Sequence, residues 1–510
     1  MDIDNSYAAP ETGDHAAFDD DCLLTDADLR RRLIERWPLL NEVWARRLFA
    51  YVFVGRFRDR ESDMLMMGAA FLRDRLGVDG KRLKRFRREV FDLKLTQSRR
   101  PHPSNPSEQG RTRQLQRHEC PREVVEELRR SWRGGGPFVS FATGCPPKPG
   151  GWDDALSDAD NVVPEARFLV DHLHAVPNEA LAWLERRADS RIADLDKAPE
   201  SDALRDEPIL CRVRACARVR YRGARRSPRL YAFGTSYLAL TRESRKHLGQ
   251  PFAACDLRQC QLVVASALWK ADLFAEKLSK KNFSVWEWLA KAVGCGSGHK
   301  DALKQAVYSL VFGKAEGGLK KALSESIGTR AAKRFLALPE MRQLLDRRED
   351  ALNRLRTVGG EVDAFGRGIG LCADAEEARS RLSYQIQSYE LRIMLGLAER
   401  VIEEGFHVVG FLHDGMSIHG DDKAAADRLL RRLEKLSVEV GKEVLGVPIY
   451  LETNQWERRG RKPSRRAGAE PPASPADFEP FAPSPPDAGL VQGADVPDGE
   501  DAGGRLAVAA

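Results

Sequence analysis

The segment from Lys300 to Gly313 constrains the fold of this 510-residue chain more than any other. Lys300, Lys304, Tyr308 and Phe312 follow one another at steps of four residues, so they would share one face of a helix. Glycines lie on both sides of the segment, which predicts a helix with defined ends. Lys300 would stand near the helix N-terminus, where the macrodipole favours anions and disfavours cations. This face therefore indicates either an ordinary solvated basic surface with two core aromatics or a binding site for a phosphate.

Composition narrows the partners and the compartment of the chain. Lys and Arg number 82 against 76 Asp and Glu, a net charge of +6, and the acidic residues gather at the two ends. The middle is therefore more basic than the total, which favours a polyanionic partner. No stretch reaches the apolar length of a transmembrane helix, and the acidic N-terminus is unlike a signal or transit peptide. Nine cysteines without regular spacing fit reduced thiols, so we expect a cytoplasmic protein without a membrane partner.

Composition and hydrophobic periodicity divide the chain into six parts. We expect a disordered acidic N-terminus (1–24), a helical module (25–95), a basic linker (96–118), a second helical region (119–207), a central domain (208–457) and a disordered tail (458–510). Short apolar runs within 208–239 alternate with polar residues and predict a few strands at the start of the central domain. The helical module carries a basic face at 81–88, which is either a solvated surface or a contact with nucleic acid.

Two aspartates stand at the ends of apolar runs on either side of the predicted helix. Asp256 follows a short apolar run and precedes a helical one, so it caps that helix or binds a metal, and capping is the commoner use. Asp414 lies in a His-Asp-Gly turn between two apolar strands, a good hairpin sequence that can also hold a carboxylate beside a cleft. Two carboxylates suit two Mg²⁺ ions, which can activate a hydroxyl and stabilise the leaving oxygen of a phosphoryl transfer. With Lys300 and Lys304 on nucleotide phosphates, the three elements together predict a nucleotidyl-transfer site.

The order of these elements resembles the family A DNA polymerases, the group of bacterial DNA polymerase I and phage replicative enzymes. The similarity covers roughly residues 215 to 457. Three motifs carry it: the first palm motif (256–261), the fingers-helix motif (300–313) and the last palm motif (413–415). Weaker matches are the Gly-Arg turn at 366–367, Arg379, Gln387, the final strand at 449–456, and Arg229.

The resemblance implies an α+β, predominantly helical fold with the palm, fingers and thumb of a right hand, in which 119–207 would be a reduced thumb. It implies a nucleoid-associated DNA-directed DNA polymerase of replication or repair, whose partners are a DNA primer–template and deoxynucleoside triphosphates. The primer 3′-hydroxyl would attack the α-phosphate of a dNTP and release pyrophosphate. The N-terminal part has no Asp-x-Glu motif on an apolar strand to hold exonuclease metals, so no proofreading activity is expected.

The resemblance also assigns roles to single residues. Asp256 and Asp414 would hold the two Mg²⁺ ions, and Lys304 would neutralise or protonate the triphosphate. The other nucleotide-binding residues would be Lys300, Tyr308, Phe312 and Gln261. The primer–template residues would be Arg229, Arg379, Gln387 and His413.

Three positions depart from the family and keep two alternatives open. Gln261 stands where a Glu is usual near the sugar 2′ position, and Gly415 stands where a Glu usually follows His-Asp. Lys300 stands where Arg is common, which replaces a bidentate fork by a point charge. A single-subunit RNA polymerase shares the palm, the helix lysines and the His-Asp turn, and Gln261 leaves it open. A catalytically silent, DNA-binding replication accessory is the second alternative, for which Gly415 is the main reason.

Overall fold

The computed structural model describes most of the chain between Cys22 and Gln455. The described residues are 22–53, 64–67, 72, 76–90, 96–98, 115–119, 121–147, 162–197, 200–224, 227–233, 236–249, 253–314, 316–420 and 422–455. The predictions of disorder for the first 21 residues and for the C-terminal tail lie outside these residues, as does the middle of the predicted linker.

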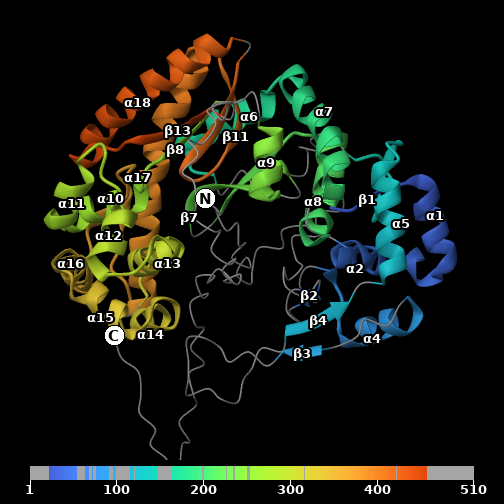
Figure 1. Cartoon of the computed structure of the whole chain (residues 1–510), viewed down its shortest axis with the longest axis horizontal. Coiled ribbons are helices and arrows are strands. Elements are labelled where there is room, and N and C mark those ends of the chain that lie inside the picture. Colours follow the sequence, from blue (N-terminus) through green and yellow to red (C-terminus); the bar gives the residue numbers. More distant parts are fainter. Residues whose placement is uncertain are drawn as a thin grey trace, which may run out of the picture.

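A four-stranded antiparallel sheet lies at the centre of the larger group of elements. Its strands are β8 (Ala253–Leu257), β11 (His407–Phe411), β12 (Gly415–His419) and β13 (Leu451–Gln455), in the order β11-β12-β8-β13. Every second residue of β8 is buried, as a strand with one face on a core requires. The long helices α17 (Ala375–Glu403) and α18 (Lys423–Leu445) contact the sheet and each other (Figure 1). The two strands predicted on either side of Asp414 are thus confirmed.

The chain between β8 and α17 is mostly helical. Its helices are α10 (Cys260–Trp269), α11 (Asp272–Leu278), α12 (Val285–Val293), α13 (Lys300–Val311), α14 (Glu316–Ile327), α15 (Thr329–Ala337) and α16 (Pro339–Thr357). A short hairpin of β9 (Glu361–Val362) and β10 (Gly368–Ile369) follows. The helix predicted at 300–313 is confirmed as α13, and it buries Leu303, Val307 and Leu310 against the core. Across the described ranges, no helix is long and apolar enough to cross a membrane.

A buried arginine of α16 holds the C-terminal end of α13. Arg348 is 3% exposed, and its Nη1 donates to the carbonyl oxygens of Leu310 (3.0 Å) and Lys314 (2.9 Å). A cation is favoured there because the last carbonyls carry the negative end of the helix dipole. The C-terminal end of α13 is therefore tied to α16, whereas Lys300 at its other end is exposed.

The N-terminal elements form a second core. They are β1 (Leu24–Asp26), α1 (Ala27–Arg36), α2 (Val43–Phe53), β2 (Met64–Met67), α4 (Gly80–Glu89), β3 (Thr96–Ser98), β4 (Leu115–Glu119), α5 (Arg122–Arg133) and β5 (Phe138–Ser140). Their buried apolar residues, together with Cys211, are separate from the large core that runs from 162 to 449. Helices α7 (Asn178–Asp194) and α8 (Glu200–Ala215) lie between the two groups (Figure 1). Buried Glu207 of α8 pairs with Arg129 and Arg133 of α5 and so joins them.

The boundaries of this part differ from the predictions in two ways. Strands β3 and β4 form a three-stranded sheet with β2, although both begin inside the segment predicted as a linker. The region 119–207 is also divided, because α5 contributes Val124, Leu128 and Trp132 to the N-terminal core, whereas α6 (Arg167–Ala175) and α7 belong to the large core. The strands β3 and β4 are short and polar, so they show little periodicity, and the periodicity of α5 predicts a helix without showing which core it joins.

The strands expected from residue 208 onward begin later than predicted. Ile209, Leu210 and Val213 belong to α8, and all three are buried. A helix that is buried on several sides has no polar stripe, so its apolar residues do not show the 3.6-residue period that identifies a helix. The strands of this region are β6 (Arg220–Ala224) and β7 (Ser227–Phe233), which pair with each other.

Candidate active site

The sheet brings Asp256 and Asp414 together. Gly415 of β12 lies opposite Asp256 of β8, and the backbone N–H of Leu257 donates to the carbonyl oxygen of Asp414 at 2.5 Å. The hairpin between β11 and β12 closes where the N–H of Leu412 donates to the carbonyl of Gly415 at 2.7 Å. Two aspartates from distant parts of the sequence therefore lie at the same end of the sheet, Asp256 in β8 and Asp414 in the turn before β12.

The strand–helix junction shows that Asp256 does not cap the following helix. Helix α10 begins at Cys260, and the residue at its N-cap position is Gln259, in the left-handed conformation with φ 55°. Asp256 lies within β8 and does not cap the helix. The guanidinium of Arg258 donates to the carbonyls of Lys281 and Phe283, which anchors the junction. The carboxylate of Asp256 is thus left for another use.

The two aspartates are partly buried, and the charge of Asp414 disfavours ionisation of Asp256. Burial, followed by the charges of Asp414 and Glu452, raises the pKa of Asp256 from 3.8 to about 7. Burial also raises the pKa of Asp414, against the opposing charges of Arg229 and Lys304. Paired carboxylate oxygens suit a hard divalent cation, and such an ion would relieve the repulsion between them. Within the described ranges, no group of three or more His, Cys, Asp or Glu that could hold a metal ion is found.

The structure gives a steric reason for a glycine at position 415, which the sequence did not show. A Cβ atom at this position would lie 1.9 Å from Oδ1 of Asp256 and 3.1 Å from the carbonyl oxygen of Cys255. The carboxylate of Asp256 thus occupies the space that a side chain at 415 would need. The departure from the family at Gly415 is matched to the position of Asp256 in this chain.

Two residues of the predicted face of α13, Lys304 and Tyr308, interact electrostatically with Asp414. Lys304 is partly buried, and burial lowers the pKa of its ammonium while the charge of Asp414 acts to raise it. Its Nζ lies 5.7 Å from the centre of the Tyr308 ring, and that ring packs edge-on against Trp286 with centroids 5.8 Å apart. Phe312 ends the helix and is also partly buried. Lys304 and Tyr308 therefore lie within electrostatic reach of Asp414.

The C-terminal end of α13 meets one of the predicted primer–template residues. Gly313 has φ 92°, and a Cβ atom there would lie 2.8 Å from Cδ of Arg379 on α17. The stem of Arg379 thus crosses the C-terminal end of α13, and the residue as a whole is exposed. This contact needs a glycine at 313, which explains why the motif ends there.

The other predicted primer–template residues form a polar network around His413. The Ser227 hydroxyl donates to Oε1 of Gln387 at 2.6 Å, and the Tyr231 hydroxyl donates to Ser227 at 2.9 Å. The Tyr231 ring packs edge-on against His413, with centroids 5.0 Å apart. Burial and the charge of Arg229 lower the pKa of His413 well below its ordinary value, so the imidazole is neutral at physiological pH.

Two charged residues of the site were missed from the sequence. Glu390 of α17 is fully buried and pairs with Arg229, and Glu452 of β13 lies opposite Asp256. Each is a lone acidic residue beside an apolar run, Leu391–Leu397 for the first and Ile449–Leu451 for the second, and this was the signal available. Arg229, expected at the primer–template, has its guanidinium on Glu390 and is 11% exposed as a side chain.

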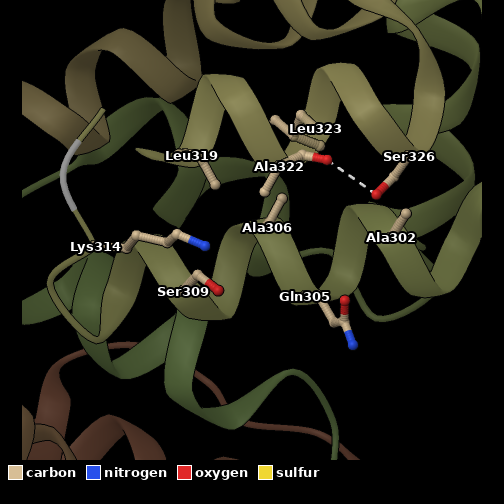
Figure 2. Close-up of a pocket in the computed structure, with 9 residues that line it drawn as sticks. All are labelled: Ala302, Gln305, Ala306, Ser309, Lys314, Leu319, Ala322, Leu323 and Ser326. Carbon is tan, nitrogen blue, oxygen red and sulfur yellow. Dashed lines mark hydrogen bonds between the residues drawn. The ribbon is translucent and has the colours of Figure 1, made fainter. Parts of the chain in front are cut away.

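A small pocket lies on the other side of α13. It is formed by residues of α13 and α14 and by the segment between them: Ala302, Gln305, Ala306, Ser309, Lys314, Leu319, Ala322, Leu323 and Ser326 (Figure 2). None of the predicted site residues lines it, so it is separate from the aspartates. Its Ser326 hydroxyl donates to the carbonyl of Ala322 within the same helix.

Comparisons with known proteins find similarity to solved structures and to no family model or curated protein. The chain is similar to the POL domain of Pol1 from M. smegmatis in complex with DNA primer–template and dNTP, with a TM-score of 0.38 and 13% sequence identity. The match covers 85% of this chain and 67% of that one. A likeness of this size carries no weight for activity, and we base the function on the geometry of the site.

Proposed function

We propose that the site catalyses nucleotidyl transfer, and that the chain is a template-directed DNA polymerase that extends a primer with dNTPs. One observation carries the proposal: Asp256 and Asp414 stand side by side on β8 and at the β12 hairpin, within electrostatic reach of Lys304 on α13. Paired carboxylates beside a lysine suit the transfer of a charged phosphoryl group, because charge must be stabilised on both the attacking and the leaving oxygen.

The residues have separate tasks in this reaction. Asp256 and Asp414 would hold Mg²⁺, which when bound would activate the primer hydroxyl and stabilise the charge on the phosphate oxygens. The primer 3′-oxygen forms a bond to the α-phosphorus as the bond from that phosphorus to the bridging oxygen breaks, and pyrophosphate leaves. Lys304 stabilises the triphosphate and the charge that develops on pyrophosphate. Lys300, exposed at the start of α13, is placed for the outer phosphates.

The structure bears differently on the two alternatives. The silent accessory rested on Gly415, and the close approach of Asp256 gives that glycine a packing reason compatible with catalysis. A single-subunit RNA polymerase would use the same aspartates and lysines. The choice between dNTP and rNTP is therefore made by experiment.

Primer extension tests the proposal. Purified protein is incubated with a primed DNA template, Mg²⁺, and either dNTPs or rNTPs. We expect extension with dNTPs that requires Mg²⁺, and we expect Asp414→Asn to abolish extension while primer–template affinity stays within about threefold. A clear preference for rNTPs would replace the DNA polymerase by the RNA polymerase. No extension with Mg²⁺ or Mn²⁺ by the wild-type protein would favour the silent accessory.

We also propose that helix α4 adds affinity for the DNA backbone. Six of its ten residues are Lys or Arg, and Lys81 and Lys84 are exposed. Releasing counterions from about two phosphates changes the slope of log affinity against log salt by about 2. Replacing both lysines by Gln should reduce the slope by that amount, whereas Gln at Lys435 and Lys442 of α18 should leave it unchanged. Equal slopes for the two double variants would remove α4 from the DNA interface.

A further inference from the structure

Glu390 is a buried carboxylate to which the proposed reaction assigns no task. It lies on α17 with 0% exposure, and one of its oxygens, Oε2, accepts from Nε of Arg229 at 2.7 Å and also from Nη2. The other oxygen, Oε1, accepts from the amide Nε2 of Gln261 at 3.3 Å. Glu390 thus joins three elements, β7, α10 and α17, beneath the site.

The same carboxylate interacts electrostatically with Tyr308 of α13 and with Asp414. Burial is the main reason for the raised pKa of Tyr308, and the charges of Asp414 and Glu390 add to it. Burial likewise raises the pKa of Cys260, with the charges of Glu390 and Asp414 adding to the effect. These contributions locate Glu390 within electrostatic reach of both α13 and Asp414. The guanidinium of Arg229 is the cation that offsets this charge.

The hydrogen bond to Glu390 dictates which residue type fits at 261. A carboxylate at 261 would bring a second negative charge to about the distance of this hydrogen bond, and like charges in a buried site disfavour each other strongly. An amide donates instead, and its donation fixes its orientation, since only Nε2 can face a carboxylate. The carbonyl oxygen of Gln261 is then held as an acceptor on the remaining side.

We propose that Glu390 is a positioning residue for the incoming nucleotide, acting through the amide of Gln261 and the guanidinium of Arg229. This inference rests on the proposed function, because it concerns the same nucleotide site. Without Glu390, the Gln261 amide is free to rotate, and Arg229 is left as a buried cation without its present partner. Both changes alter the charges and hydrogen bonds near Tyr308. They should therefore weaken nucleotide binding more than DNA binding.

A charge exchange between positions 390 and 261 tests the inference. The variants are Gln261→Glu, Glu390→Gln and the two combined, assayed for incorporation of one dNTP on a saturating primer–template. Each single variant should raise the KM for dNTP at least about tenfold, because it leaves either two carboxylates or two amides in contact. The double variant should recover at least about threefold of the loss in the worse single variant, because one carboxylate and one amide face each other again, whereas Arg229 still lacks its carboxylate at position 390.

Glu207→Gln is the matched control. Glu207 is also fully buried and also paired with arginines, but those arginines, Arg129 and Arg133, lie on α5 of the N-terminal core. It should lower the denaturant midpoint without changing the KM for dNTP. If Glu390→Gln behaves in the same way, Glu390 has only a structural role and the inference is wrong. Unchanged KM values in both single variants, or a double variant no better than the worse single one, would also overturn it.

A binding measurement separates the inference from the proposed function. The affinity of the complex with a dideoxy-terminated primer for the next dNTP, at fixed Mg²⁺, needs no catalysis. The same loss in the single variants and recovery in the double variant are expected there. Absence of extension by wild type would count against polymerase activity, whereas the pattern of dNTP affinities would still decide the role of Glu390.

Discussion

Replacing Gly415 by alanine should move the carboxylate of Asp256 and disable the site while leaving the fold intact. The new Cβ would lie 1.9 Å from Oδ1 of Asp256, where ordinary contact begins at 3.4 Å, so that oxygen must move by about 3.4 − 1.9 = 1.5 Å. The nearest obstacle is the end of a side chain, which can rotate away, and the backbone carbonyl oxygen of Cys255 at 3.1 Å needs to shift by only a few tenths of an ångström. The expected damage is therefore to the position of the carboxylate more than to the stability of the sheet.

The size of the effect follows from that displacement. A misplacement of about 1 Å in a reacting group can cost about 100-fold in rate, which corresponds to about 2.7 kcal/mol of transition-state stabilisation. Gly415→Ala should accordingly lower single-turnover incorporation by about 100-fold or more. Because the two aspartates would no longer converge, the Mg²⁺ concentration for half-maximal rate should also rise. Rapid-quench incorporation over a series of Mg²⁺ concentrations measures both quantities.

Two other glycines supply matched controls. A Cβ at Gly410 on the neighbouring strand would meet the Tyr237 hydroxyl oxygen at 1.8 Å, and one at Gly370 would meet nothing within 4 Å. Gly410→Ala should therefore lower the unfolding midpoint, and Gly370→Ala should change neither stability nor rate. Incorporation by Gly415→Ala within threefold of wild type, at an unchanged Mg²⁺ requirement, would refute the geometry on which the proposed site depends.

Three further predictions concern the helix face, its anchor and the stability of the large core. Lys304→Ala should lower kcat/KM for dNTP by about 100-fold or more, with partial recovery in Lys304→Arg, because it removes a preorganised cation beside the phosphates; steady-state kinetics would contradict this if the loss stayed below threefold. Arg348→Met should cost about 2–4 kcal/mol in urea unfolding, because two buried carbonyls at the end of α13 lose their donor; a cost below about 0.5 kcal/mol would show that the anchor is dispensable. Burial and then Arg218 lower the pKa of His174 from 6.5 to about 4, so the unfolded chain binds the extra proton and stability is lost as pH falls from about 6.5 towards 4. His174→Gln should make urea midpoints less sensitive to pH in that window, and an unchanged pH dependence would assign the loss to other groups.

Local patterns predicted the elements that carry the site. The steps of four between Lys300 and Phe312 correspond to α13, because a helix repeats every 3.6 residues and its ends are marked by glycine. The apolar runs around Asp414 correspond to β11 and β12, because a two-residue turn between such runs makes a hairpin. In both cases the structure depends on residues close together in the sequence. The sequence also predicted that Asp256 would stand at a strand–helix junction. It left open whether Asp256 caps the helix, and the structure shows that it does not.

Features that depend on contacts between distant segments were not predictable in this way. Most residues of β3 and β4 were predicted to be a linker, and the end of α8 was predicted to be strands. The local sequence does not identify these elements, because the pattern of polar and apolar residues in each depends on the core against which it packs. From the sequence, Gly415 indicated the loss of a carboxylate. The pairing of β12 with β8 shows that the carboxylate of Asp256 occupies the space that a side chain at 415 would need. The sequence did not indicate a role for Glu390. Only the packing of β7, α10 and α17 brings it into contact with Arg229 and Gln261. Periodicity determined which residues share a face, and tertiary structure decided which faces meet, because the charge and space around a buried group come from segments far away in the chain.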